Sequence, residues 1–182
     1  MIYYISPYRP DRNIGKTIND NIRQLNAADE DWIVHTDQDV LFLLPDTKQR
    51  IETILSATTF DILGAVTNRL GINSQLVQGA FNITDIKEHI RIAEQLQSNT
   101  VAEYHDILAA FCLCFRIKTW KQLGGFAENS LSFDSTFSIM AKRSGLKLGL
   151  MTGIYVFHLY RMMSDNPMMA IHHLLPQTPC VE

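Results

Sequence analysis

Two aspartates interrupt an apolar stretch near the start of the chain, in the sequence WIVHTDQDVLFL over residues 32–43. Side chains two positions apart lie on the same face of an extended chain, so Asp37 and Asp39 project together. Two neighbouring carboxylates repel each other unless a cation or a proton lies between them. A hard divalent ion such as Mg²⁺ or Mn²⁺ removes the repulsion and leaves coordination positions for phosphate oxygens.

Two other interpretations of this stretch remain open. Aspartate is common in solvated turns that follow a strand, and such a turn needs no metal. His35 has the same parity as Asp37 and Asp39, so it is a further candidate ligand. A histidine beside an apolar run is also compatible with a packed, hydrogen-bonded core position.

The elements that must position these aspartates follow from the spacing of apolar residues. Between residues 14 and 25, Ile14, Ile18, Ile22 and Leu25 fall at helical spacing, and Asn13 is a candidate N-cap. Further helices are expected from Asp46 and over residues 83–99, 118–126 and 132–145. Short β-rich or apolar runs predict strands at residues 2–6, 31–36, 61–66, 109–117 and 146–160.

This alternation of strands and helices predicts an α/β protein built around a mainly parallel sheet. The run AAFCLCFRI is apolar almost throughout, which is typical of a strand covered on both faces. Ligands of open α/β sheets bind beyond the carboxyl ends of the strands, where Asp37 and Asp39 fall. Arg69 follows the third expected strand at the same edge and is a candidate substrate contact.

A second constellation lies downstream. It consists of Gly124-Gly125-Phe126-Ala127-Glu128, then Asp134, then Gly145 eleven residues later, and finally His158 in YVFHLYR. Together with the Asp37-Gln38-Asp39 motif and the upstream NIGKTIND segment, this order resembles the GT-A glycosyltransferases, particularly their family-2 group. Two positions differ: Phe133 replaces the first member of an acidic pair, and the segment between the first strand and NIGK is short.

The resemblance implies a three-layer α/β/α GT-A fold. It predicts one truncated GT-A-like domain over residues 1–163, with residues 164–182 as a covering tail. It also implies an inverting, metal-dependent transfer of a sugar from a nucleotide-diphosphate sugar to an acceptor hydroxyl, with Mn²⁺ or Mg²⁺ as cofactor. The alternative function is a non-catalytic remnant that binds a sugar nucleotide or a glycan. A nucleotidyltransferase is a third candidate, although only one glycine lies in the loop after the first strand.

Site roles follow from the same resemblance. Asp39 would be a direct metal ligand, and Asp37 would face the metal or the nucleotide ribose. His158 would be a further metal or diphosphate ligand, or else a core histidine. Asp134 would be the catalytic base, or else a helix N-cap. Arg161 would clamp a phosphate, or else be a surface cation.

Composition narrows the classes of partner and environment. A net charge of −3 without a Lys/Arg-rich run argues against nucleic acid. The three cysteines are expected to be reduced thiols of a cytoplasmic protein. No run is long and apolar enough for a transmembrane helix, so no membrane span is expected.

Overall fold

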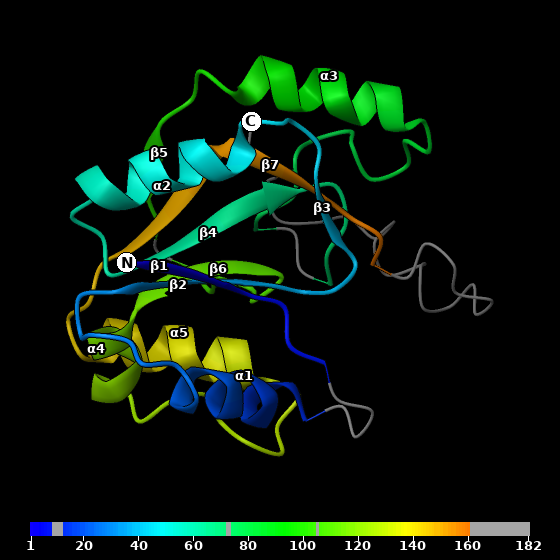
Figure 1. The fold of residues 1–182 in the computed structure, drawn as a ribbon. Coiled ribbons are helices and arrows are strands. Elements are labelled where there is room, and N and C mark those ends of the chain that lie inside the picture. The colour runs from blue at the N-terminus through cyan, green and yellow to red at the C-terminus, as the bar shows by residue number, and fades with distance from the viewer. Residues whose placement is uncertain (9–12, 72–73, 105, 161–182) are drawn as a thin grey trace.

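The computed structural model describes residues 1–8, 13–71, 74–104 and 106–160. These residues form seven strands and five helices (Figure 1). The strands are β1 (Ile2–Ile5), β2 (Trp32–Thr36), β3 (Val40–Phe42), β4 (Ile62–Thr67), β5 (Val101–Glu103), β6 (Cys112–Arg116) and β7 (Leu148–His158). The helices are α1 (Ile14–Arg23), α2 (Thr47–Ala57), α3 (Ile86–Leu96), α4 (Ile117–Gln122) and α5 (Phe133–Arg143).

The strands form one mixed sheet in the order β1-β2-β6-β4-β7-β3, with β5 also paired to β7. The pairs β1–β2 and β4–β7 are parallel, whereas β2–β6, β4–β6, β3–β7 and β5–β7 are antiparallel. Strand β6 lies antiparallel between β2 and β4, so β1, β2, β4 and β7 share one direction. Their carboxyl ends therefore meet at one edge of the sheet.

The expected three-layer, mainly parallel GT-A architecture is wrong. The sheet mixes parallel and antiparallel strands and curls into a half-barrel. The mainly parallel sheet was inferred from the alternation of strands and helices, which does not fix strand direction, and neither does the burial of β6 on both faces. All of Cys112–Phe115 is buried, yet β6 is antiparallel to both of its neighbours. The short strands β3 and β5 were not expected either, because their few residues show no clear alternation.

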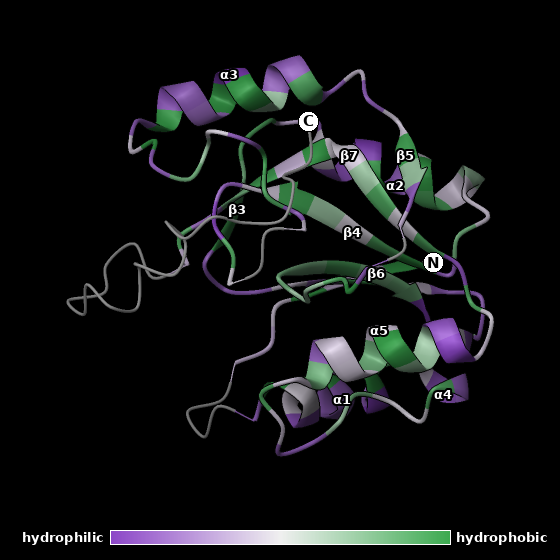
Figure 2. Cartoon of the chain, turned by 180° about the vertical axis from the view of Figure 1, so that it is seen from behind, coloured by the Kyte–Doolittle hydropathy of each residue, from purple (hydrophilic) through white to green (hydrophobic). Residues whose placement is uncertain are grey.

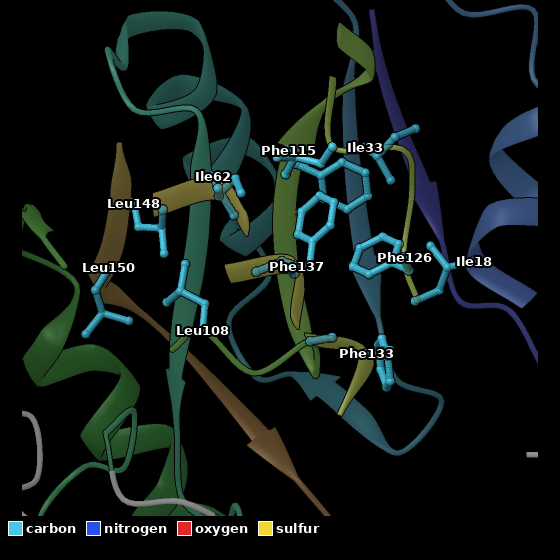
Figure 3. Close-up of a cluster of buried hydrophobic side chains, with 14 of the residues drawn as sticks. Ile18, Ile33, Ile62, Leu108, Phe115, Phe126, Phe133, Phe137, Leu148 and Leu150 are labelled. Carbon is cyan, nitrogen blue, oxygen red and sulfur yellow. The ribbon is translucent and has the colours of Figure 1, made fainter. Parts of the chain in front are cut away.

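Two hydrophobic clusters fill the two sides of the sheet. One joins α1 and α5 to alternate residues of β2, β4 and β6, with Phe115, Phe126 and Phe137 packed at its centre (Figure 3). The ring centroids of Phe126 and Phe137 are 4.2 Å apart. The other cluster holds Ile51 and Leu55 of α2 against the opposite side of the sheet. Figure 2 shows the matching pattern, with apolar residues along the strands and polar residues interspersed on the helices.

Local sequence signals explain several helix boundaries. The side chain of Asn13 accepts a hydrogen bond from the Lys16 backbone N–H at 3.2 Å, so the expected N-cap of α1 is confirmed. Gly145 follows α5 with φ of 74°, a conformation that glycine adopts without strain. Helix α3 begins at Ile86, three residues later than expected, where the Asp85 side chain caps it through the Lys87 N–H.

Of the three cysteines expected to be reduced, Cys112 and Cys114 are buried free thiols that point to the same side of the sheet, and Cys180 lies outside the described residues. In the described part of the chain, no helix is long and apolar enough to cross a membrane. The predicted covering tail, residues 164–182, lies outside the described residues.

Candidate metal centre and active site

The two aspartates and His158 meet at the carboxyl edge of the sheet. Strand β2 ends at Thr36, and the chain then crosses this edge through Asp37 and Asp39 before β3 pairs with the end of β7. The backbone N–H of Asp37 donates to the Phe111 carbonyl at 2.9 Å. The carbonyl of Asp39 accepts from the Leu159 N–H at 3.0 Å. These bonds hold the aspartate segment between β6 and β7.

The three side chains form a compact cluster of oxygen and nitrogen donors. Nε2 of His158 lies 3.2 Å from Oδ1 of Asp39 and 3.9 Å from Oδ2 of Asp37. One donor atom from each residue lies within 4.8 Å of the other two. His158 is buried, whereas the side chains of Asp37 and Asp39 are 34% and 45% exposed. The cluster is thus anchored on the protein side and open to ligands on the other.

The other ring nitrogen of His158 fixes its orientation. Nδ1 lies 2.9 Å from the carbonyl oxygen of Arg69, which can only accept, so the hydrogen is on Nδ1. Nε2 then faces the carboxylates, which is the arrangement typical of metal-ligating histidines. When the His158 ring is protonated, its Nε2–H donates to Asp39 and lowers the pKa of that carboxyl, so Asp39 is ionised at neutral pH.

The donor set fits a divalent cation. Asp37 and Asp39 offer hard oxygens, and His158 offers an imidazole nitrogen. Mn²⁺ accepts both kinds of donor, whereas Mg²⁺ strongly prefers oxygen. Three protein ligands leave further coordination positions free for oxygens of a bound substrate.

Two cavities adjoin the cluster, and Asp37 lines both. One has a volume of about 310 Å³ and is also lined by His158, Asp134, Phe111 and Tyr160. The other, of about 370 Å³, is lined by Asp39 and Gln38 together with apolar residues and Tyr8. The first cavity therefore connects two of the predicted metal ligands, Asp37 and His158, with the predicted base Asp134.

Asp134 does not occupy the N-cap position of α5, so the cap interpretation is wrong for that position. The N-cap residue is Ser132, and Asp134 lies within the first turn. One oxygen of Asp134 accepts the Ser135 N–H at 2.7 Å. Burial raises the pKa of Asp134, although hydrogen bonds from the backbone of Ser135 and Ala110 oppose the rise. A raised pKa makes a carboxylate a stronger base.

The Gly124–Glu128 motif has a clear structural role. Gly125 has φ of 84°, and a Cβ there would lie 2.9 Å from Oδ1 of Asn19. That oxygen accepts the backbone N–H of Phe126 and Nε1 of Trp120, both at 2.9 Å. Asn19 belongs to α1, and on that helix a Cβ on Gly15 would lie 2.2 Å from the Ala127 carbonyl oxygen. The motif docks its loop onto α1 and so helps to set the position of Asp134.

Two arginines, Arg69 and Arg161, were predicted to contact a substrate. Neither side chain is found at the cluster among the described residues. The guanidinium of Arg69 stacks over the ring of Phe81 at 4.3 Å, and burial lowers its pKa. Arg69 does not line either cavity; its backbone carbonyl orients His158 instead. Arg161 lies outside the described residues.

Two further residues support the cluster and were missed from the sequence. Oδ1 of Asn68 accepts the His158 backbone N–H at 2.8 Å, and Asn68 is fully buried. Phe111 stacks on the His158 ring at a centroid distance of 5.4 Å. The sequence held only a weak indication of the role of Asn68, which is a polar residue directly after the apolar strand Ile62–Thr67.

The chain matches no known protein-family model, and a search of curated proteins finds no relative. The resemblance to glycosyltransferases therefore rests on the motifs quoted above. The geometry adds that Asp37, Asp39 and His158, from distant parts of the chain, share one cluster, and that Asp134 shares a cavity with two of them.

Proposed function

We propose that this protein is a metal-dependent glycosyltransferase that uses a nucleotide-diphosphate sugar as donor. One observation carries the proposal: Asp37, Asp39 and His158 form a cluster that fits a divalent cation, and the adjoining cavity contains Asp134. A cation ligand set and a separate base are the two requirements of sugar transfer from a diphosphate.

The residues have distinct roles in the proposed reaction. A bound divalent cation would stabilise the charge that develops on the leaving diphosphate. Asp134 accepts the proton of the acceptor hydroxyl while the acceptor oxygen bonds to the sugar carbon and the bond from that carbon to the diphosphate breaks. The raised pKa of Asp134 suits this step. The aromatic rings of Phe111 and Tyr160 also line this cavity.

Mn²⁺ is the proposed cofactor in preference to Mg²⁺, because one of the three donors is an imidazole nitrogen. We propose that the donor nucleotide binds against Asp37 and Asp39, whose side chains are partly exposed. The acceptor is a hydroxyl compound small enough in its reacting part for a cavity of about 310 Å³.

One observation favours a second candidate, a non-catalytic protein that binds a sugar nucleotide or a glycan. Phe133 takes the place of an acidic residue in the glycosyltransferase pattern. Its side chain is only 7% exposed and packs at 5.9 Å from the ring of Phe126. Core packing has therefore replaced one charge next to Asp134. This candidate shares the metal cluster but assigns no proton transfer to Asp134.

The first test is a panel of nucleoside diphosphates and nucleotide sugars, scored by thermal shift with and without Mn²⁺. A ligand that binds the folded state raises the melting temperature by mass action. We expect at least one nucleotide to do so only when Mn²⁺ is present, and we expect Asp39→Asn to remove that dependence. If no nucleotide shifts the melting temperature with Mn²⁺, the transferase proposal loses its support, and the second candidate is reduced to glycan binding.

A second test separates the two candidates. Turnover of the nucleotide sugar that binds is measured for the wild type and for Asp134→Asn. A transferase loses turnover by roughly a hundredfold or more in the variant and keeps nucleotide binding. A wild type that binds the nucleotide sugar without any turnover, across a panel of hydroxyl acceptors and water, supports the binding protein.

A further inference from the structure

His35 is a buried histidine whose hydrogen bonds are not satisfied. It lies on β2, is only 1% exposed, and neither ring nitrogen has a hydrogen-bond partner among the described residues. Buried polar atoms are nearly always paired, because an unpaired one loses its hydration without compensation. Because the unpaired His35 ring lies beside the candidate metal site, a neighbouring group that can come within hydrogen-bonding distance of it is a candidate partner.

The nearest such partner is Asp37. Nε2 of His35 lies 3.5 Å from Oδ1 of Asp37, too far for a strong hydrogen bond. The second oxygen of the same carboxylate, Oδ2, faces Nε2 of His158 at 3.9 Å. Asp37 thus presents one oxygen to the metal cluster and the other to His35.

We propose that His35 is a positioning residue for the metal centre. Its Nε2–H donates to Oδ1 of Asp37 when the cluster holds its cation, and so directs Oδ2 toward the cation. The inference rests on the proposed function. A movement of the partly exposed Asp37 carboxylate by less than about 1 Å would bring Oδ1 within hydrogen-bonding distance of Nε2. The ring of His35 is buried and is held in place by the core.

The proposed arrangement makes the two histidines of the site complementary. His158 contributes a nitrogen to the cluster and is oriented by the Arg69 carbonyl. His35 contributes no ligand and orients a carboxylate instead. Hydrogen bonds of this outer kind typically account for 10- to 100-fold in metal affinity.

The test uses two substitutions of similar polarity that differ in where they place a donor. In His35→Gln the side-chain amide reaches the position of Nε2, and in His35→Asn it reaches only that of Nδ1. The affinity for Mn²⁺ alone is measured by electron paramagnetic resonance of the free ion. We expect His35→Asn to weaken binding by about tenfold or more, and His35→Gln to stay within about threefold of the wild type.

A purely structural role for His35 gives a different pattern. Melting temperatures of the metal-free variants measure any general damage, which is expected to be similar for Asn and Gln. Equal Mn²⁺ affinities for the two variants would overturn the inference. If the wild type itself fails to bind Mn²⁺, the proposed metal centre fails as well; a wild type that binds while both variants match it overturns only the role of His35.

Discussion

Among the described residues, buried histidines occupy two regions, and their surroundings differ. His89 on α3 is fully buried, with Nδ1 2.7 Å from the Tyr155 hydroxyl and Nε2 3.0 Å from the Ile83 carbonyl. At the carboxyl edge, neither nitrogen of His35 has a hydrogen-bond partner within the described part of the chain, and Nε2 of His158 faces two carboxylates. These histidines are thus similarly buried, but the ring nitrogens of His89 are hydrogen-bonded within the protein and those at the edge are not all satisfied.

The difference distinguishes a buried histidine with a structural role from buried histidines that could serve a binding site. The Ile83 carbonyl can only accept, so Nε2 of His89 carries the hydrogen and Nδ1 accepts from Tyr155. Every polar atom of that ring is satisfied inside the protein, and nothing is left to bind a ligand. In contrast, the histidines of the edge leave nitrogen atoms directed at Asp37 and Asp39. Residual bonding capacity in a cavity is a mark of a binding site.

The largest effect is expected from the satisfied histidine. His89→Leu leaves the Tyr155 hydroxyl and the Ile83 carbonyl without their partners, so it should lower the free energy of unfolding by about 3 kcal/mol. Tyr155→Phe, which removes only one donor, should cost about 1 kcal/mol. Urea titration provides both values. Mn²⁺ affinity should be unchanged in each variant, and a weakened affinity would remove the distinction between the regions.

The next effect concerns the edge. His158→Asn retains a donor at the position of Nδ1 for the Arg69 carbonyl and removes Nε2 from the cluster. We expect Mn²⁺ affinity to fall roughly 100-fold, equivalent to about 2.7 kcal/mol. The urea midpoint of the metal-free protein should change much less. Unaltered Mn²⁺ binding, measured by paramagnetic resonance, would exclude His158 as a ligand.

A smaller effect of opposite sign is expected at Asp134. Burial raises the pKa of this carboxyl, so its charged form opposes folding at neutral pH. Asp134→Asn should therefore increase the free energy of unfolding at pH 7 by about 1 kcal/mol while lowering the proposed turnover by roughly a hundredfold or more. The gain should shrink as pH falls through the raised pKa toward the unfolded value, because Asp134 is then protonated in the wild type. A loss of stability at pH 7 would indicate a structural role in α5.

The smallest effect is the pH dependence of His89. Burial lowers its pKa in the folded state, so the unfolded chain binds the proton more readily. The contribution of neutral His89 to stability is present above the unfolded pKa of about 6.5 and is lost as pH falls toward the folded value. Urea titrations between pH 7.5 and pH 5 should show this loss in the wild type. His89→Leu should be less sensitive over the same range.

The sequence predicted the candidate metal ligands better than it predicted the residues that position them. The D-x-D spacing placed Asp37 and Asp39 after a strand, and His158 was expected within the closing strand at residues 146–160, which ends at His158 in the structure. The structure brings these residues together, but Asn68, which holds the His158 backbone, carried no distinctive signal. Arg69 was expected to offer its guanidinium and instead offers its carbonyl, because its side chain stacks on Phe81. Side-chain direction after a strand is set by tertiary packing, which local patterns do not encode.

Local sequence determined the main helices and the longer strands, since apolar spacing and caps such as Asn13 act within a few residues of the chain. It also determined which residue types were available for metal chemistry. Only the tertiary structure decided the direction of β6, the pairing of β3 with β7, and the resulting distance of 3.2 Å between His158 and Asp39. Strand pairing joins residues that are distant in sequence, and its free energy comes from the packing of the whole sheet rather than from any single segment.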